Sequence, residues 1–329
     1  MAEPEALPSE PLPKDAPLPG TLGSLRPPAL NLLLFALTGA SAFAAGALLT
    51  DSSLPPPDRP EMVRHGLAFA VSLLVILLSH EMGHFLLAKR HGVDATWPFF
   101  IPAPLVSLIG TLGAVMKLRS LPRTRRALID IAVAGPLAGF LVTLPVLALG
   151  LWLSPLVNDE PLTHHWTLAR AIEMMLRTGH WLAMKDGFEL GQPLAMQALD
   201  LLIHGQLPAG KALALHPVAI AGWFGLLLTA LNLLPLGQLD GGHLLYGASP
   251  RWHRLVAAPL SGVLVGLGVF SPFVGWLLWG LLTGLWFNGH PQLAEPEEKL
   301  DTTRRLLLVA ALVLMVLSFV GAPLKTISG

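Results

Sequence analysis

The sequence contains no cysteine and few charged residues. Without cysteine the chain has no disulfide, no thiolate metal ligand and no cysteine nucleophile, so a bound metal must be held by histidine and carboxylate. Charged residues make up 13% of the 329 residues and hydrophobic residues 53%, whereas an ordinary soluble domain is about 25% charged. The formal net charge is zero, so no overall field favours nucleic acid as a partner. This composition indicates a polytopic protein embedded in a lipid bilayer.

Long apolar segments predict an all-α polytopic membrane protein with about seven transmembrane helices. The expected spans are residues 28–50, 66–90, 127–153, 216–234, 255–270, 273–287 and 306–324. We expect the chain to divide into a disordered Pro-rich tail (1–27), a membrane-embedded domain (28–288), a cytoplasmic linker (289–305) and a C-terminal transmembrane helix (306–329).

Two connecting regions have patterns that simple loops lack. Near residues 93–118, prolines and glycines alternate with apolar residues, which predicts short β-strands or a re-entrant segment. Irregular backbone at membrane depth is tolerated only where protein or a wet cavity shelters it. Apolar residues at helical spacing within 155–215 predict one or two amphipathic helices at the membrane interface.

Basic residues gather in the loop between the second and third spans. They are Lys89, Arg90, Lys117, Arg119, Arg123, Arg125 and Arg126. Because cytoplasmic loops are enriched in Lys and Arg, this loop is expected to face the cytoplasm. The membrane expected is a bacterial inner membrane. Asp130 follows Arg126 by four residues, which predicts an ion pair within the third helix.

The second span contains an ionisable cluster, His80-Glu81-Met82-Gly83-His84. Such groups are costly to insert into a membrane, so their presence there favours a functional site. The pattern is H-E-x-x-H, which on a helix places two imidazoles on one face with a carboxylate beside the first. The motif alone is weak, because it also occurs by chance in soluble helices. A catalytic zinc site needs a third protein ligand.

Asp240 is the candidate for that third ligand. The fourth span meets Pro235, passes Gly237 and reaches Asp240-Gly241-Gly242. Proline removes a backbone donor and glycine permits tight turns, so the chain can leave the helix there and turn the carboxylate inward. The alternative is that Asp240 caps the next helix or begins a loop. The buried pair of histidines favours the ligand role.

Together these motifs resemble the site-2 protease family of intramembrane zinc metalloproteases. The second motif of that family, N-x-x-P-x-x-x-x-D-G, is matched by Asn232, Pro235, Asp240 and Gly241. Three further segments resemble the branch without PDZ or CBS domains that includes plastid-type and bacterial homologues: Phe100-Ile101-Pro102, Gly110-Thr111-Leu112-Gly113-Ala114 and Ala134-Gly135-Pro136-Leu137-Ala138-Gly139. The resemblance covers about residues 66–246, the expected catalytic core.

The resemblance implies a reaction and a role for each residue. His80, His84 and Asp240 would bind one Zn²⁺, and Glu81 would be the general base that takes a proton from water. Asn232 would contact the substrate backbone or the oxyanion; hydrogen bonding to the backbone freed by Pro235 is the structural alternative. The substrates would be transmembrane proteins, cut in or near their membrane spans.

Several expectations remain open. The segment around Gly110 to Ala114 either offers a strand edge to an unwound substrate or is a packed plug. His243 either supports the zinc ligands or is an ordinary loop residue. Two other functions fit a polytopic chain with buried His and Asp: a metal-binding transporter and a proteolytically inactive scaffold of the same fold. A scaffold has no chemical need for all four of the residues His80, Glu81, His84 and Asp240. A transporter would often show paired broken helices in corresponding halves, which this sequence does not, and it has no obvious need for Glu81.

Overall fold

The computed structural model describes residues 28–49, 59–104, 106–158, 167–178, 184–286, 293 and 299–328. The expected tail, and most of the expected linker, lie outside the described residues. The helices described are α1 (Ala29–Leu49), α2 (Arg59–Arg90), α3 (Arg125–Trp152), α4 (Leu168–Thr178), α5 (Leu194–His204), α6 (Pro217–Asn232), α7 (Asp240–Ala248), α8 (Pro250–Phe270), α9 (Gly275–Trp286) and α10 (Thr302–Ser318).

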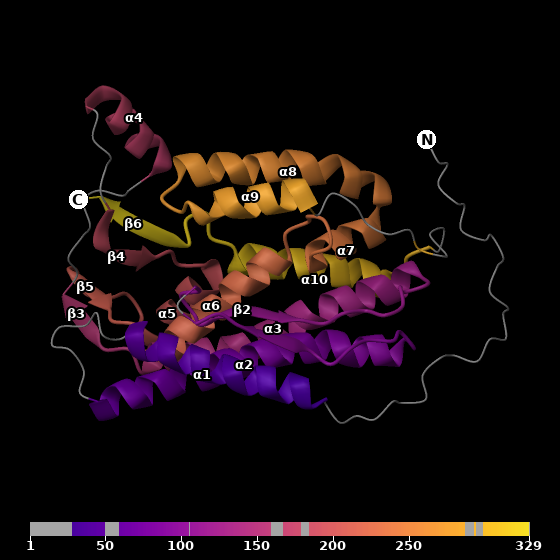
Figure 1. Cartoon of the computed structure of the whole chain (residues 1–329), viewed down its shortest axis with the longest axis horizontal. Helices are drawn as coiled ribbons and strands as arrows, with labels where there is room; N and C mark the ends of the chain where they lie inside the picture. The colour runs from indigo at the N-terminus through magenta and orange to yellow at the C-terminus, as the bar shows by residue number, and fades with distance from the viewer. Residues whose placement is uncertain are drawn as a thin grey trace.

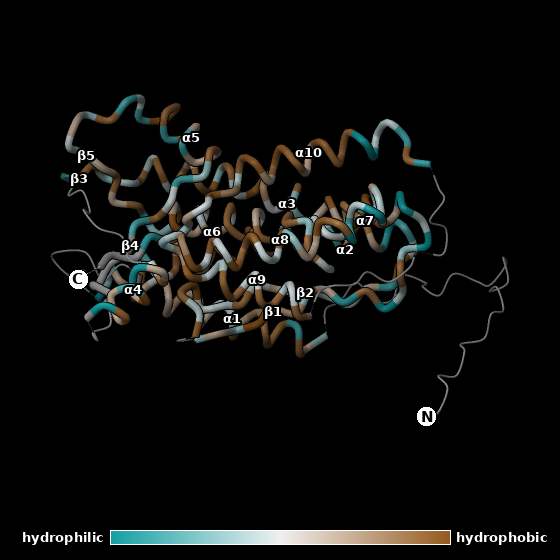
Figure 2. Tube along the Cα trace, turned by 90° about the horizontal axis from the view of Figure 1, so that it is seen from above, coloured by the Kyte–Doolittle hydropathy of each residue, from teal (hydrophilic) through white to brown (hydrophobic). Residues whose placement is uncertain are grey.

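The longer helices run side by side along the longest axis of the molecule (Figure 1). α2 packs against α1, α3 and α6, and α3 also packs against α6, α7 and α10. Apolar residues follow the middle of this bundle, and polar residues gather at its two ends (Figure 2). Trp223 of α6 is fully buried, and its indole N–H donates to the carbonyl oxygen of Gly191 at 2.6 Å. α2, α3 and α6 therefore form the centre of the fold.

Within the described ranges, four helices are long and apolar enough to cross a membrane: α1, α2, α3 and α8. They match four of the seven expected spans. Long apolar helices of this kind are consistent with a helical membrane protein. The other three expected spans appear as shorter helices, α6 with 16 residues, α9 with 12 and α10 with 17. The number seven is therefore not confirmed.

The helix boundaries that differ most from the sequence-based expectation are the start of α2 and the end of α10. α2 begins at Arg59, seven residues before the expected start at Gly66, because Pro60 in its first turn favours a helix start and needs no donor partner there. α10 ends at Ser318 although a helix was expected to Leu324. Residues Leu324–Ser328 instead form β6, which pairs antiparallel with β4 (Met184–Leu190). α10 has already ended before Pro323, and this proline also rules out a helix that continues to Leu324.

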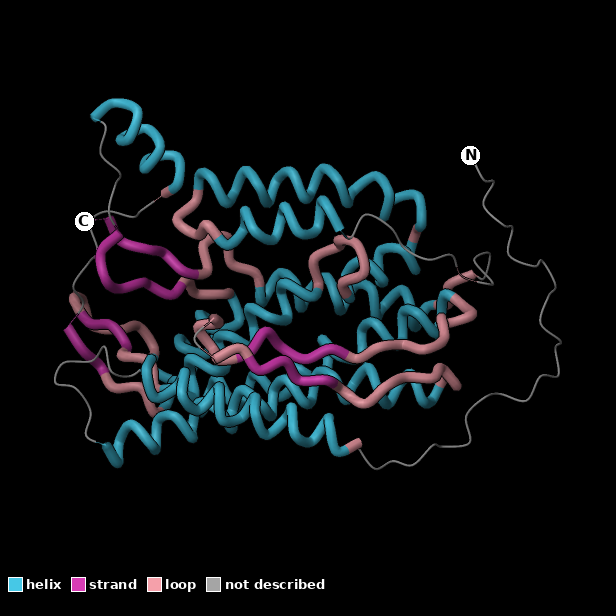
Figure 3. The backbone as a smooth tube through the Cα atoms, in the orientation of Figure 1, coloured by secondary structure: helices cyan, strands magenta, loops and turns pink. Residues whose placement is uncertain are grey.

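The irregular segment after α2 forms a hairpin, so the predicted short strands are present. β1 (Phe99–Pro102) pairs antiparallel with β2 (Thr111–Val115), and Figure 3 shows this hairpin running lengthwise along the bundle. The side chain of Asn31 in α1 donates to the carbonyl oxygens of Trp97 and Pro98, at 3.1 and 2.8 Å. This contact fixes the entry of the hairpin against α1. The re-entrant alternative is not confirmed.

The region 155–215 contains the two predicted helices, α4 and α5, together with strands that were not predicted. β3 (Leu156–Asn158) pairs with β5 (Lys211–Leu213), and both lie with β4, β6 and α4 at one end of the bundle (Figure 1). Strands of three residues carry too little pattern to be recognised in a sequence.

Candidate metal centre

The first half of the candidate site lies on α2. His80, Glu81 and His84 are all buried, with 8%, 7% and 8% of their surface exposed. The two histidines are one helical turn apart, and their Nε2 atoms lie 3.2 Å from each other. The expected arrangement of the H-E-x-x-H motif on one helix face is therefore present.

A backbone contact fixes the orientation of His84. Its Nδ1–H donates to the carbonyl oxygen of Ile131 in α3, at 2.8 Å. Because Nδ1 carries the proton in the neutral ring, Nε2 keeps a lone pair, and this atom faces His80. A hydrogen bond from the second ring nitrogen to a carbonyl is the usual means by which proteins orient a metal-binding histidine.

α3 lies close to the imidazoles because it has glycine where they pass. A Cβ atom at Gly135 would lie 2.1 Å from Nε2 of His84, and one at Gly139 would lie 3.2 Å from Nδ1 of His80. The Gly135-Pro136-Leu137-Ala138-Gly139 segment therefore leaves room for both rings. In the sequence these glycines belong to a segment that resembles the family, and the structure gives a physical reason for them.

The second half of the site is built where the chain unwinds after α6. Residues 233–239 form turns, with Gly237 at φ 52°, and α7 begins at Asp240. A Cβ at Gly241 would lie 2.0 Å from the carbonyl oxygen of Leu233, so only glycine permits this close approach of α7 to the unwound segment. The N-cap of α7 is Leu239, not Asp240. The expected alternative, in which Asp240 caps the helix, is therefore wrong.

The two halves meet. Oδ2 of Asp240 lies 3.3 Å from Nε2 of His80 and 3.3 Å from Nε2 of His84. Two imidazole nitrogens and a carboxylate oxygen thus face one another, and three such acceptors repel unless a proton or a cation lies among them. This is the one group of three His or acidic ligands, among the described residues, whose ligand atoms lie close enough to hold a metal ion.

The spacing of these three atoms fits zinc. Zinc takes nitrogen and oxygen ligands at about 2.0–2.2 Å in a tetrahedron, which places neighbouring ligand atoms about 3.3–3.5 Å apart. The separations of 3.2, 3.3 and 3.3 Å agree with that value without any rearrangement. Three protein ligands also leave the fourth position open, as catalytic zinc sites do.

A cavity of about 220 Å³ opens beside the cluster. Glu81 and Asn232 line it, and the side-chain Nδ2 of Asn232 lies 3.2 Å from Nε2 of His80. His243 lines the same cavity, as does the last part of the hairpin from Ala114 to Met116. The sequence singled out Glu81, Asn232 and the hairpin segment for roles at the site, and it left the role of His243 open.

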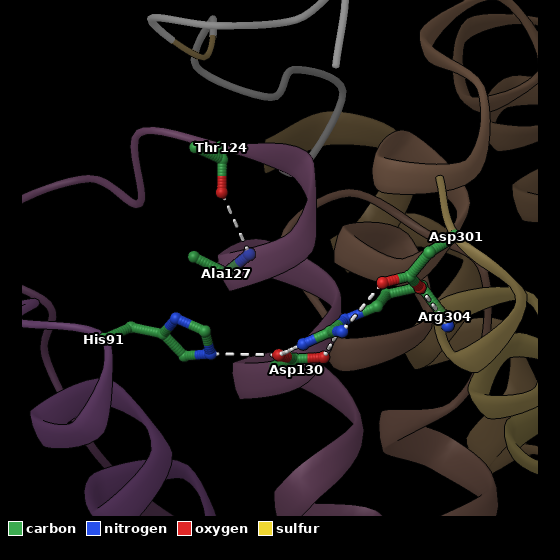
Figure 4. Close-up of polar contacts among 6 residues, drawn as sticks. All are labelled: His91, Thr124, Ala127, Asp130, Asp301 and Arg304. Carbon is green, nitrogen blue, oxygen red and sulfur yellow. Dashed lines mark hydrogen bonds and ion pairs between the residues drawn. The ribbon is translucent and has the colours of Figure 1, made fainter. Parts of the chain in front are cut away.

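Asp130 does not have the partner expected within its own helix. The structure pairs this buried carboxylate with Arg304 of α10 and with His91, whose Nε2 lies 2.9 Å from Oδ2 (Figure 4). The expectation of Arg126 rested on spacing along one helix. The observed partners come from other segments, which no spacing rule could identify.

Comparison with known proteins identifies the family. The description "Peptidase family M50" matches residues 68–271, which include both halves of the site. The chain belongs to this family. The resemblance to site-2 proteases is thereby confirmed, and the zinc expected of that family agrees with the ligand cluster.

The chain is also similar to plant proteins. It is 33% identical over 309 residues to the probable zinc metalloprotease EGY1, chloroplastic, of Arabidopsis thaliana, covering 88% of this chain and 52% of that protein. The rice (Oryza sativa subsp. japonica) protein of the same name is 32% identical over 311 residues, covering 88% of this chain and 50% of that protein. The chain thus spans about half the length of these curated relatives. Their names place them in chloroplasts, and nothing in the comparisons supports the expected bacterial inner membrane. No solved structure matches.

Proposed function

We propose that this chain is an intramembrane zinc metalloprotease that hydrolyses peptide bonds in or near the transmembrane segments of substrate proteins. The observation that carries the proposal is that His80, His84 and Asp240 lie together beside Glu81. These residues line a cavity, and all of them belong to the part of the chain that matches the peptidase family. Family membership supports the reaction class. The transporter and scaffold alternatives have no observation in their favour.

Each residue then has a chemical role. His80, His84 and Asp240 hold the zinc, with the ring of His84 oriented by the carbonyl of Ile131. Zinc, when bound, supplies Lewis acidity, which lowers the pKa of a water and polarises the peptide carbonyl. Glu81 removes a proton from the attacking water and delivers it to the leaving amine. Asn232 lines the cavity, where its amide can donate to the substrate backbone or to the developing oxyanion.

The proposal also includes the number of membrane crossings and the orientation of the chain in the membrane. Counting α6, α9 and α10 with the four longer helices gives the expected seven crossings, the short ones sheltered by their neighbours. Lys89 and Arg90 end α2 and Arg125 begins α3, so the basic end of the bundle is the one nearer the site. We infer that this end faces the cytoplasmic side. The catalytic core, about residues 66–246, remains the unit that holds every proposed site residue.

The decisive experiment compares the wild type with Glu81→Gln. Both are reconstituted in lipid vesicles with a tagged single-span test substrate. The variant keeps its zinc ligands but cannot take a proton, so we expect unchanged zinc content and cleavage lower by roughly 10²–10⁴-fold. Glu61→Gln is the matched control, because Glu61 lies in the first turn of the same helix, far along it from the cluster. Unchanged cleavage in Glu81→Gln contradicts the proposal.

β2 is the proposed binding edge for the substrate. It pairs with β1 on one side only, and within the described chain its other edge has no strand partner. Leu112 and Val115 are exposed, and Ala114 and Val115 line the cavity. A transmembrane helix must unwind before its peptide bonds can be attacked, and a free strand edge binds extended peptide by main-chain hydrogen bonds.

Proline substitutions test this edge, because proline removes a backbone donor without adding a charge. We expect Leu112→Pro or Val115→Pro to lower cleavage of the test substrate at least tenfold at unchanged zinc content. Leu112→Ala and Val115→Ala keep the backbone donor and should cleave normally. If both proline variants cleave at the wild-type rate, the edge does not bind substrate.

A further inference from the structure

Asp130 is a buried carboxylate that the proposed reaction does not use. It lies on α3 with 7% of its surface exposed. Arg304 of α10 binds it with two guanidinium nitrogens: Nε donates to Oδ1 at 2.8 Å, and Nη2 donates to Oδ2. His91, just after the end of α2, donates to Oδ2 at 2.9 Å. A buried charge is costly unless it is paired, and this one joins α3, α10 and the end of α2 (Figure 4).

The next residue after Asp130 orients a zinc ligand. The carbonyl oxygen of Ile131 accepts the hydrogen bond from Nδ1 of His84. His84 and His91 are seven residues apart, which is two helical turns, so the segment beginning at His84 contacts two consecutive residues of α3. Any shift of the α3 backbone at this point moves the carbonyl that sets the ring of His84.

Arg304 is itself held from a second side. Asp301 is the N-cap of α10, and its Oδ1 accepts from the backbone N–H of Arg304 at 2.9 Å. Its Oδ2 accepts from Nη1 of Arg304 at 3.0 Å. The guanidinium thus lies between two carboxylates, in the planar two-pronged geometry that gives Arg–carboxylate pairs their directional strength. The direction of the Asp130 side chain is fixed by α10.

We propose that Arg304 is a positioning residue of the zinc centre, acting through Asp130 and the Ile131 carbonyl on His84. This inference rests on the proposed function. α10 lies outside residues 68–271, the part that matches the family. The proposal therefore means that α10, although outside the matched residues, helps to set the geometry of the metal site.

The test measures zinc binding rather than cleavage. Purified full-length wild type and Arg304→Gln are titrated with zinc against a competing chelator, and the electronic spectrum of the cobalt-substituted protein reports the ligand geometry. Loss of a residue that supports a metal ligand weakens metal affinity about 10–100-fold, so we expect about tenfold weaker zinc and an altered cobalt spectrum. Arg305→Gln is the matched control: its side chain is exposed on the same helix, and both readouts should stay at wild-type values.

A second variant separates positioning from stability. Asp130→Asn with Arg304→Gln removes both charges, and removing a whole buried ion pair is far less destabilising than leaving one charge unpaired. Positioning predicts that this double variant regains thermal stability while zinc affinity and cobalt spectrum stay altered. If zinc affinity returns with stability, or if Arg304→Gln binds zinc like the wild type, the inference is wrong. A wild type that binds no zinc contradicts the proposed function instead.

Discussion

α2 delivers His80, Glu81 and His84 from an uninterrupted helix, whereas Asp240 comes from a chain that unwinds between α6 and α7. In the first region, the spacing of the ligands follows from helical geometry, and the neighbouring helix only has to leave room for them. In the second region, turns and close backbone contacts bring the carboxylate into place. Gly237 has a positive φ, and its carbonyl oxygen accepts from Nε2 of the fully buried His253 at 3.0 Å.

This difference tells how each half can fail. The half of the site on α2 depends on the space that α3 leaves for the two imidazole rings. A larger residue on α3 would displace a ligand while α2 itself stays intact. The α6–α7 half depends on backbone conformation, so a substitution there changes both the ligand and the local fold. Substitutions at one glycine in each half should therefore separate loss of metal from loss of stability.

Of the two glycine substitutions, Gly135→Ala is expected to have the larger effect on zinc. The added Cβ would lie 2.1 Å from Nε2 of His84, so the ring must turn away from the metal position. We expect zinc affinity at least about 100-fold weaker, the upper range for disturbed metal surroundings, with little change in thermal stability because only the end of a side chain has to move. Zinc titration and thermal unfolding in detergent measure the two quantities.

Gly262→Ala is the control for that substitution. Gly262 lies within α8, and a Cβ there would meet no atom within 4 Å. Zinc affinity and cleavage should equal those of the wild type, and stability should stay the same or rise slightly, since alanine favours helix over glycine by up to about 1 kcal/mol. Wild-type zinc affinity in Gly135→Ala would contradict the volume account of the α2 half.

A smaller loss of zinc, accompanied by loss of stability, is expected for Gly241→Ala. The Cβ would lie 2.0 Å from the carbonyl oxygen of Leu233 and 2.6 Å from that of Leu234, and backbone cannot move as a side chain can. α7 must shift and carry Asp240 with it. We expect about tenfold weaker zinc, together with destabilisation of about 1–3 kcal/mol, the usual cost of overpacking. Unchanged stability would show that close backbone contact does not hold this half in place.

The sequence could predict the features that depend on neighbours along the chain. The H-E-x-x-H motif fixes two ligands and a base by helical spacing alone, and the four longest helices follow from apolar length. Asp240 was predictable only beside the buried pair of histidines and the Pro and Gly residues that break the helix, because its position depends on the turns from Leu233 to Leu239. The space that Gly135 leaves for His84 could not be predicted, because it depends on how α3 packs against α2.

The ion pair of Asp130 also depends on packing that the sequence does not reveal. A rule for residues four apart on a helix predicts Arg126 as the partner, and it cannot predict Arg304, which is 174 residues away in sequence. The expected helix up to Leu324 failed for a related reason: the pairing of β6 with β4 is a contact between distant segments. Local pattern determines helices and motifs, whereas long-range contacts determine their partners.

The most direct test of the account is the zinc content of Asp240→Ala. The central claim is that one metal site is shared between α2 and the broken end of α6. The wild type should hold about one zinc per chain, and Asp240→Ala should lose most of it while remaining folded. Asp200→Ala removes another carboxylate beside an imidazole, that of His204 at 2.8 Å, and should keep its zinc. Full zinc occupancy in Asp240→Ala would contradict the claim that the two halves form one site.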